Sequence, residues 1–305
     1  MSSKYDWDDI LSRRTNGETW PEIAKDLGMP PSTLRSAFVR AKERMQKVGA
    51  TDGMRILGID IETAPHTAYV WRMWDANVST DQVVETGRVM CFASQWFDDP
   101  FSEVEFWSEH HQGHRKMVER AHELLTEADA VVHYNGSRFD IPMLNREFIK
   151  ANLSPPDPSR EIDLIRTVRK RFKFSRNSLD AVLRELGLGA KEKHEGFTVW
   201  VKCMKGDPEA WENMKRYNLG DVTEMKKLYD ILLPWISTHP NHALYKHPEG
   251  PTCPNCGGTK LHRRGYSYTK TQKYQKYQCQ NCGTWTRERY TAIHPDVRKA
   301  ILTQA

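Results

Sequence analysis

The chain has 305 residues, of which 38% are hydrophobic and 28% charged, and its net charge is +5. This length suits one substantial α/β domain with one or two small attachments. No apolar run approaches the roughly 20 residues that cross a bilayer, and the polar start of the chain has no signal-peptide core, so we expect a cytoplasmic protein rather than a membrane protein.

Basic residues gather near both ends of the chain. Residues 31–50 hold five Lys or Arg against one acid, and residues 253–290 hold eight against one. Two basic flanks around a more acidic centre favour binding of a polyanion. Two solvated basic faces are the simpler alternative.

The first fifty residues predict three short helices, because apolar residues recur at spacings of three and four. Ala24 is small where two helices would cross, and Gly28 would end the second helix. Residues 20–35 therefore indicate a helix-turn-helix. Arg35 would then lie at the start of a DNA-recognition helix, and Arg40 would extend along its polar side towards phosphates. The alternative is a helical cap that packs on the main domain and contacts no DNA.

Residues 56–63 predict a strand buried on both faces, yet two carboxylates, Asp60 and Glu62, interrupt it. Side chains alternate between the faces of a strand, so these two acids project together. Two acids on one face of a buried strand need a cation. For an isolated Asp-x-Glu, a strand end where the acids meet water or one arginine is the alternative.

The segments that follow predict a mixed α/β sheet covered by helices, with its first three strands in an antiparallel meander. A polar, aromatic loop is expected at 65–82. The predicted strands are 56–63, 88–97, 104–107, 130–134 and 161–165, and the predicted helices are 114–127, 141–151, 177–187 and 207–233.

Asp140 follows a predicted strand, at the kind of strand end where α/β sheets place their sites. The alternative, which the motif favours when taken alone, is that Asp140 caps the next helix. Asn135 and Phe139 add a short polar group and an aromatic face, which suit the seating of a sugar or base near the carboxylate.

The last long helix begins with Asp207 as its cap and carries Tyr217 and Asp221 on one face, four residues apart. Gly220 between them costs a helix about 1 kcal/mol relative to Ala, so a close approach of another backbone or of a ligand is expected there. Viewed alone, the Tyr–Asp pair also fits an ordinary hydrogen bond at a helix margin.

Taken in order, these three acidic motifs resemble those of the DEDDy branch of the DnaQ-like 3′–5′ exonucleases, which have a ribonuclease H-like fold. The resemblance covers about residues 55–235. The sequences at 60–65, 162–164 and 177–182 also resemble stand-alone relatives of the family B DNA polymerase proofreading domain.

The resemblance implies a two-metal hydrolysis with Mg²⁺ or Mn²⁺. Asp60 would bridge both ions, and Glu62 and Asp221 would complete the site of the ion that activates water. Asp140 would support the second ion, and Tyr217 would orient the attacking water in the place where the DEDDh branch has His. Independently of the resemblance, four gathered carboxylates require cations, and oxygen-only ligands select Mg²⁺ or Mn²⁺.

Near the C-terminus two C-x-x-C knuckles, each followed by glycine, are separated by 22 residues: Cys253, Cys256, Cys279 and Cys282. They predict one structural Zn²⁺, with free thiols or an iron centre as alternatives. Aromatic and basic residues alternate between and beyond the knuckles, and some of these aromatics are needed for packing. Nucleic-acid contacts are expected from Arg263, Arg264, Tyr266, Lys273 and Lys276. The segment resembles the zinc ribbons of some transposases and phage-type nucleases.

The expected organisation is a helix-turn-helix at 1–50, a ribonuclease H-like exonuclease domain at 55–237, a zinc ribbon at 250–292 and a tail at 293–305. The expected function is a stand-alone, phage-type DNA exonuclease of a bacterial or phage-infected cell that releases nucleoside 5′-monophosphates. Its DNA would be single-stranded or a 3′ end, with duplex contact through the helix-turn-helix. The rivals are a structure-specific endonuclease or transposase/resolvase-like enzyme, and a non-catalytic DNA-binding regulator.

Overall fold

The computed structural model describes residues 10, 13–14, 18–36, 38, 53–74, 77–189, 196–245, 248 and 250–303. The chain forms two compact units. One consists of residues 1–52 with 99–102, and the other of residues 53–98 with 103–305. No helix in the described part of the chain is both long and apolar enough to span a membrane.

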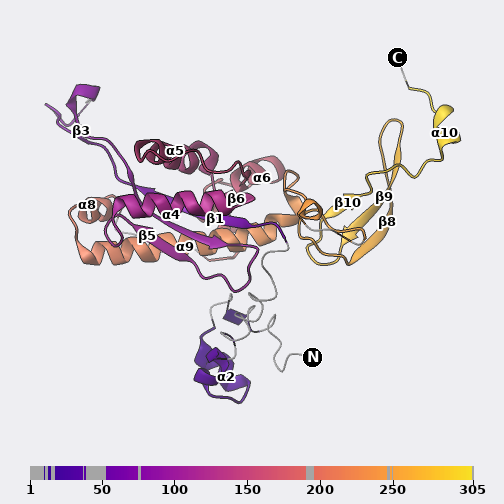
Figure 1. The fold of residues 1–305 in the computed structure, drawn as a ribbon, viewed down its shortest axis with the longest axis horizontal. Coiled ribbons are helices and arrows are strands. Elements are labelled where there is room, and N and C mark those ends of the chain that lie inside the picture. The colour runs from indigo at the N-terminus through magenta and orange to yellow at the C-terminus, as the bar shows by residue number, and fades with distance from the viewer. Residues whose placement is uncertain are drawn as a thin grey trace. The chain divides into compact units, whose positions relative to one another are not determined.

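A five-stranded mixed sheet lies at the centre of the larger unit (Figure 1). Its order is β5-β4-β1-β6-β7, with β4 antiparallel and β6 parallel to β1. The strands are β1 (Ile56–Thr63), β4 (Val89–Trp96), β5 (Glu105–Ser108), β6 (Ala130–His133) and β7 (Arg160–Asp163). β1 has a partner on each side, which confirms the buried central strand and the meander predicted from the sequence.

Helices cover both faces of this sheet. On one face, α4 (His114–Glu127) and α5 (Asp140–Lys150) pack against Leu57, Ile59 and Ile61 of β1. Each such buried side chain contributes about 1.5–3 kcal/mol. The other face is covered by α6 (Leu164–Arg171), α7 (Leu179–Glu185) and α9 (Pro208–Leu232). Because strand side chains alternate, the even-numbered residues of β1 face α9.

Two local signals decide where helices begin. The Asp207 carboxylate accepts hydrogen bonds from the backbone N–H groups of Glu209 and Ala210, so the predicted start of α9 is confirmed. Asp163 similarly accepts from Ile165 N at 3.3 Å and caps α6. The predicted strand 161–165 is therefore wrong at its end, because its last two residues are the first turn of a helix.

Besides α6 and α10 (Pro295–Lys299), two further features of the larger unit were not predicted. One is α8 (Thr198–Met204), which packs on α9. The other replaces the loop expected at 65–82: a two-stranded ribbon of β2 (Thr67–Ala68) and β3 (Val83–Glu85), with a short 3₁₀ helix η1 (Thr80–Gln82) before β3. Its strands, of two and three residues, are too short to show the period-2 pattern that marks a strand.

The smaller unit contains α2 (Trp20–Asp26), and residues 31–36 are also helical. Gly28 has φ +64° in the turn between them. Ile10, Ile23, Ala24 and Leu34 form its hydrophobic cluster. Arg35 is exposed, whereas Arg40 lies outside the described residues. The helix-turn-helix and its DNA contact stay predictions.

A three-stranded sheet near the C-terminus has the order β10-β9-β8. Its strands are β8 (Leu261–Tyr268), β9 (Lys273–Cys279) and β10 (Trp285–Arg287), and α10 (Pro295–Lys299) follows. The amide of Asn255, between the first two cysteines, donates to the carbonyls of Leu233 and Ile236 at 2.7 and 3.0 Å. This side chain fixes the first knuckle to the segment that follows α9, η3 (Leu233–Trp235).

The segment 239–251, which is polar and contains three prolines, begins as packed structure. His239 is buried, and its Nε2 lies 2.8 Å from the hydroxyl oxygen of Tyr229 on α9. It also stacks on His242, in the short 3₁₀ helix η4 (His242–Leu244). The chain therefore leaves α9 along the domain surface before it enters the first cysteine knuckle.

Candidate metal and nucleic-acid sites

Three of the four predicted acids meet where β1 faces α9. Asp60 and Glu62 project from alternate positions of β1, and Asp221 comes from α9. One carboxylate oxygen from each lies within 4.8 Å of the others. Asp221 is buried, and the other two are half-buried. The same-face pairing predicted for β1 is confirmed, and the long helix brings the third acid to it.

Asp140 approaches the same strand from another direction. Its Oδ1 accepts a hydrogen bond from the backbone N–H of Ile61, between the two β1 acids, at 3.2 Å. The N-cap of α5 is Phe139, so a role for Asp140 as a simple helix cap does not account for its position. Burial raises the pKa of Asp140. Asp140 therefore adjoins the three-acid cluster without belonging to it.

Asn218 is a site residue that sequence reasoning missed. It is fully buried on α9, and its amide nitrogen donates to Asp60 Oδ2 at 2.8 Å and to the Asp60 carbonyl at 3.3 Å. Among the described residues its Oδ1 has no hydrogen-bond partner. Asn218 thus holds the Asp60 carboxylate in one orientation. The available signal was a polar residue on the inner face of α9, one turn before Asp221.

Replacing Asn218 by leucine is expected to weaken Mn²⁺ binding about 10–100-fold, the usual cost of losing a side chain that orients a metal ligand. Titration calorimetry with Mn²⁺ measures this change. Asn213→Leu is the matched control, because Asn213 lies on the same helix and accepts a hydrogen bond from the exposed Arg216 at 2.7 Å. Equal Mn²⁺ affinity of Asn218→Leu and the wild type would contradict the orienting role.

Tyr217 and Trp200 lie beside the three-acid cluster. The indole N–H of Trp200 donates to Glu62 Oε2 at 3.3 Å. The rings of Trp200 and Tyr217 meet edge to face, with centroids 6.3 Å apart. Trp200 belongs to α8, which was not predicted, so its part in the site had no sequence signal. These contacts fix both Glu62 and the tyrosine ring.

A cavity of about 310 Å³ opens next to the acids on α9. Tyr217, Gly220 and Asp221 line it together with Arg216, Thr223, Glu224 and Lys227. A Cβ added to Gly220 would meet no atom within 4 Å, so the expected close approach of another backbone is wrong. The approach of a ligand stays a prediction, since the glycine borders open space beside two predicted catalytic residues.

The loop after β6 presents the other two residues predicted beside Asp140. Asn135 adopts a left-handed conformation with φ 71°, which Asn tolerates better than most residues. Its backbone N–H donates to Asp163 Oδ1 at 2.8 Å, so the cap of α6 also fixes this loop. Phe139 is 46% exposed. A sugar or base contact by either residue stays a prediction.

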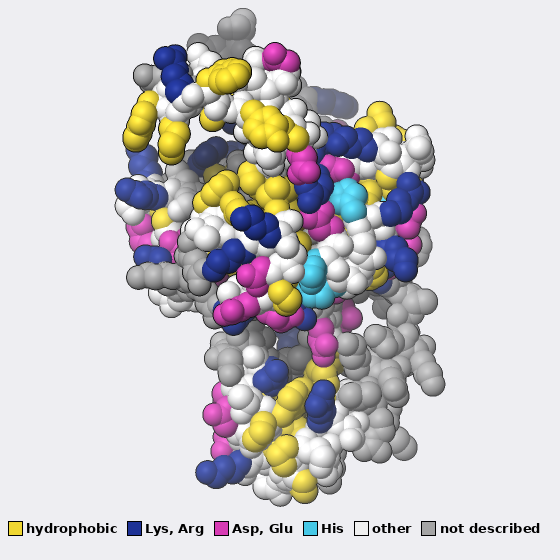
Figure 2. All heavy atoms as spheres, turned by 90° about the vertical axis from the view of Figure 1, so that its left-hand side faces the viewer, with side chains coloured by type: hydrophobic (Ala, Val, Ile, Leu, Met, Phe, Trp, Pro, Cys, Tyr) yellow, Lys and Arg dark blue, Asp and Glu magenta, His cyan; other side chains and the backbone are white. Residues whose placement is uncertain are grey.

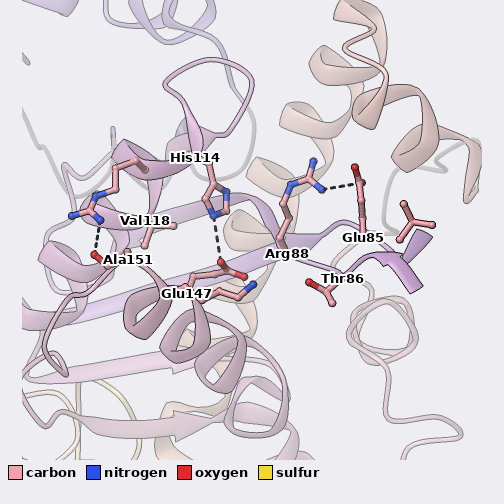
Figure 3. Close-up of a pocket in the computed structure, with 10 residues that line it drawn as sticks. Glu85, Thr86, Arg88, His114, Val118, Glu147 and Ala151 are labelled. Carbon is pink, nitrogen blue, oxygen red and sulfur yellow. Dashed lines mark hydrogen bonds and ion pairs between the residues drawn. The ribbon is translucent and has the colours of Figure 1, made fainter. Parts of the chain in front are cut away.

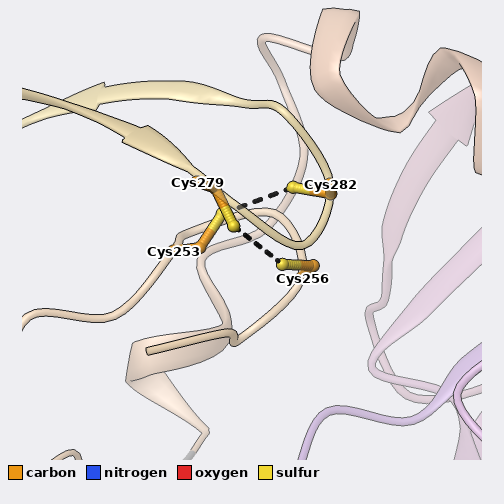
Figure 4. Close-up of side chains that lie close together, drawn as sticks. All are labelled: Cys253, Cys256, Cys279 and Cys282. Carbon is orange, nitrogen blue, oxygen red and sulfur yellow. Dashed lines mark hydrogen bonds between the residues drawn. The ribbon is translucent and has the colours of Figure 1, made fainter. Parts of the chain in front are cut away.

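The four C-terminal cysteines converge as their spacing predicts (Figure 4). Their sulfur atoms all lie within 4.8 Å of one another, with Cys253–Cys282 and Cys256–Cys279 each at 3.6 Å. Zn–S bonds of about 2.3 Å at tetrahedral angles separate sulfurs by about 3.8 Å, so the four thiols fit a zinc ion. A hydrogen bond from Cys256 lowers the pKa of Cys253 to about 5, which favours a thiolate.

The basic and aromatic residues of this sheet divide between surface and packing. Arg263, Arg264 and Tyr266 are exposed. Lys273 lies over the ring of Tyr266 at 3.8 Å, and Lys276 lies over Trp285 at 5.0 Å. By contrast, Tyr277 is buried and donates to Glu288, so it serves packing. These cation–π pairs order the exposed side chains; their contact with nucleic acid stays a prediction.

The acidic cluster suits hard divalent cations. Mg²⁺ holds its oxygen ligands at about 2.0–2.1 Å, so two ligands of one ion lie at most about 4.2 Å apart. The 4.8 Å limit of the three-acid cluster is close to that value. The carboxylates of Asp60, Glu62 and Asp221 therefore fit a divalent ion with small side-chain movements.

Comparisons with known proteins address the fold. The chain is similar to the family B DNA polymerase of the hyperthermophilic archaeon Pyrobaculum calidifontis, with 18% identity and a TM-score of 0.44, over 72% of this chain and 32% of the polymerase. No curated protein matches the chain. The family model of the RNase H superfamily matches residues 80–233, which include α9 but not β1. The chain belongs to the RNase H superfamily, and this membership supports a nuclease-type activity.

Proposed function

We propose that the chain is a metal-dependent 3′–5′ exonuclease that hydrolyses phosphodiester bonds of DNA and releases nucleoside 5′-monophosphates. The observation that carries the proposal is the meeting of Asp60 and Glu62 from β1 with Asp221 from α9. Asp140 adjoins this cluster through Ile61 N. Acids from β1 and α9 converge at one position with Asp140 of α5 beside them, which the packing of a sheet and two helices does not itself require.

The residues present account for the parts of such a site. Asp60, Glu62 and Asp221 would hold divalent ions, and Asp140 would support them from the adjoining side. Two Mg²⁺ or Mn²⁺ ions would supply electrostatic stabilisation of the charge that develops on the phosphodiester. Asn218 orients Asp60, and Trp200 orients Glu62. The open space at Gly220 leaves room for a nucleotide beside Tyr217.

Tyr217→Phe is expected to lower the cleavage rate about 10²-fold while Mn²⁺ affinity stays unchanged, because the hydroxyl would position water and bind no metal. Single-turnover cleavage and Mn²⁺ titration of the same preparation measure both quantities. Tyr245→Phe supplies the same chemical change outside the site and should cleave as the wild type. Full activity of Tyr217→Phe would contradict a role of the Tyr217 hydroxyl in cleavage.

Digestion of 5′-labelled oligonucleotides tests the proposal. Single-stranded and duplex DNA and RNA are incubated with Mg²⁺, Mn²⁺ or EDTA. A ladder that shortens from the 3′ end and requires metal supports a 3′–5′ exonuclease. Internal cuts would favour a structure-specific endonuclease or a transposase/resolvase-like enzyme instead. Binding of DNA without metal-dependent cleavage would favour a non-catalytic regulator.

We also propose that the terminal segments hold the DNA. The basic N-terminal helices would contact duplex phosphates as a helix-turn-helix, and the zinc ribbon would contact a strand near its 3′ end. The cysteine cluster and the exposed Arg263 and Arg264 support the second part. In this arrangement one chain would both bind the DNA and cleave it, whereas a polymerase binds the DNA for its attached proofreading domain.

A further inference from the structure

The ribbon between β1 and β4 carries an exposed aromatic surface that the proposed catalytic site does not use. We define the aromatic arm as residues 64–87, of which 75 and 76 lie outside the described part. Trp71 is fully exposed, Met73 is 87% exposed, Trp74 83% and Tyr69 78%. Figure 2 shows hydrophobic side chains gathered at the top of this face, over the ribbon. None of the four hydrophobic clusters of described residues includes these side chains.

The arm has a hydrogen-bonded stalk that holds the rings away from the core. Tyr69 N donates to the Gln82 carbonyl at 3.0 Å, and the Gln82 amide donates back to the Tyr69 carbonyl at 2.9 Å. Ser79 and Gln82 form a capping box around η1. At the base, Gly87 N donates to His66 Nδ1 at 3.2 Å. The stalk is therefore built from polar contacts, and the large apolar groups are presented at its outer part.

The base of the arm borders a cavity of about 580 Å³ with several cations (Figure 3). Its lining includes Glu85 and Thr86 of the arm and the basic side chains of Arg88, His114, Arg115 and Lys150. Three of these basic side chains already have acid partners: Arg88 pairs with Glu109 at 2.7 Å, Arg115 pairs with Glu119 at 2.6 Å, and His114 Nε2 lies 3.3 Å from Glu147 Oε2. The carboxylates of Glu109 and Glu147 raise the pKa of His114, which favours its charged form. The carboxylates around this cavity therefore balance most of its positive charge.

The position of the arm links its exposed rings to the acidic cluster. The arm leaves β1 directly after Glu62 and Thr63, and Tyr69–Trp74 follow within eleven residues of Thr63. An extended chain covers about 3.3–3.6 Å per residue, so the rings lie within a few nucleotides of the acids. Aromatic rings bind single strands of any sequence because every base has a π-face.

We infer that the aromatic arm is a base-stacking platform for single-stranded nucleic acid. This inference rests on the proposed function, since it supplies the strand that leads to the acids. Trp71 and Trp74 stack on bases several nucleotides from the cleaved 3′ end. A strand of two or three nucleotides is expected to occupy the acidic cluster without contacting these rings.

The test compares the full-length wild type with Trp71→Ala/Trp74→Ala. Fluorescence anisotropy measures binding of a fluorescein-labelled 20-nucleotide dT strand in EDTA, where no cleavage interferes. The double variant is expected to raise Kd at least about tenfold. Cleavage of a trinucleotide with Mg²⁺ is expected to stay unchanged. Trp71→Phe/Trp74→Phe should retain most of the affinity, whereas Trp71→Leu/Trp74→Leu should not, because leucine keeps an apolar surface but cannot stack.

Leu244→Ala is the matched control, because this apolar side chain is 81% exposed outside the arm. It should bind dT as the wild type does. Unchanged dT affinity of the alanine double variant overturns the inference, even if the wild type proves to be an exonuclease. If the wild type binds dT through these rings but cleaves no oligonucleotide, the proposed function is refuted. The inference about the aromatic arm then still stands.

Two further outcomes would also overturn the inference. In one, the leucine variant binds dT like the wild type, and light scattering shows that the alanine variant loses a wild-type dimer; the rings then pack against a second copy. In the other, only binding to phosphatidylcholine–phosphatidylglycerol vesicles falls in the alanine variant; the rings then contact lipid.

Discussion

Replacing Asp60 by asparagine is expected to lower the rate of metal-dependent cleavage about 10³-fold or more. Asp60 lies at the centre of the site, since it faces Glu62 and Asp221 and accepts a hydrogen bond from Asn218. Asparagine keeps the shape of the side chain and removes the charge that neutralises the metal. A loss of several kcal/mol of transition-state stabilisation corresponds to this factor, at about 1.4 kcal/mol per tenfold. Single-turnover digestion of a 5′-labelled strand measures it.

Asp221→Asn should reduce cleavage to a similar extent, because it removes charge from the same cluster. Asp230→Asn is the matched control. Asp230 lies on the same helix, but it is exposed and pairs with Lys226 at 2.6 Å. An exposed pair of this kind contributes at most about 1 kcal/mol, so this variant should cleave normally. Cleavage rates within tenfold of the wild-type rate for both Asp60→Asn and Asp221→Asn would contradict the assignment of these acids to the catalytic site.

Cys279→Ser is expected to abolish zinc binding and to unfold residues 253–290. Between residues 250 and 303, the buried apolar side chains of the described residues are Cys253, Tyr277 and Cys279. Such a core is too small to fold alone, whereas a structural Zn²⁺ contributes about 10–16 kcal/mol of apparent binding free energy. Zinc content by mass spectrometry and limited proteolysis of this segment measure both effects.

The same variant separates holding of DNA from cleavage. Affinity for long DNA should fall at least about tenfold, because the ribbon would supply several phosphate contacts. Cleavage of short oligonucleotides should persist, because the acids lie on β1 and α9. Cys203→Ala, at a buried cysteine of α8, is the control and should keep its zinc. An equal loss of DNA binding and short-oligonucleotide cleavage would contradict a separate holding role.

The sequence predicted the elements whose signals are local and strong. β1 was recognised because a buried strand interrupted by two acids is unusual, and α9 because Asp207 and Pro208 mark a helix start. The convergence of Asp60, Glu62 and Asp221 followed from the strand period, the spacing on the helix and the family resemblance. The cysteine cluster followed from spacing alone.

The parts that were missed depend on tertiary contacts. Asn218 acts through a carboxylate 158 residues away, so its role has no local pattern. Trp200 lies on a short helix whose sequence is equally typical of a strand, because it contains two valines and a tryptophan. The strand predicted at 161–165 ended early because Asp163 caps a helix, which depends on a hydrogen bond and not on hydrophobicity. Pairing within the aromatic arm depends on Gln82, a residue without strong strand preference.

The attachment of Asn255 to the end of α9 has a consequence for how this chain can vary. Leu233, whose carbonyl accepts from Asn255, follows Asp221 by twelve residues, or about 18 Å along a helix axis. One inserted residue in this interval would lengthen it by about 1.5 Å and rotate everything beyond it by about 100°. The number of residues in this interval therefore fixes both the distance and the relative rotation between the acids and the cysteine knuckle. The exposed side chains of α9 can therefore be substituted, whereas an insertion or deletion in this interval would move the knuckle relative to the acids.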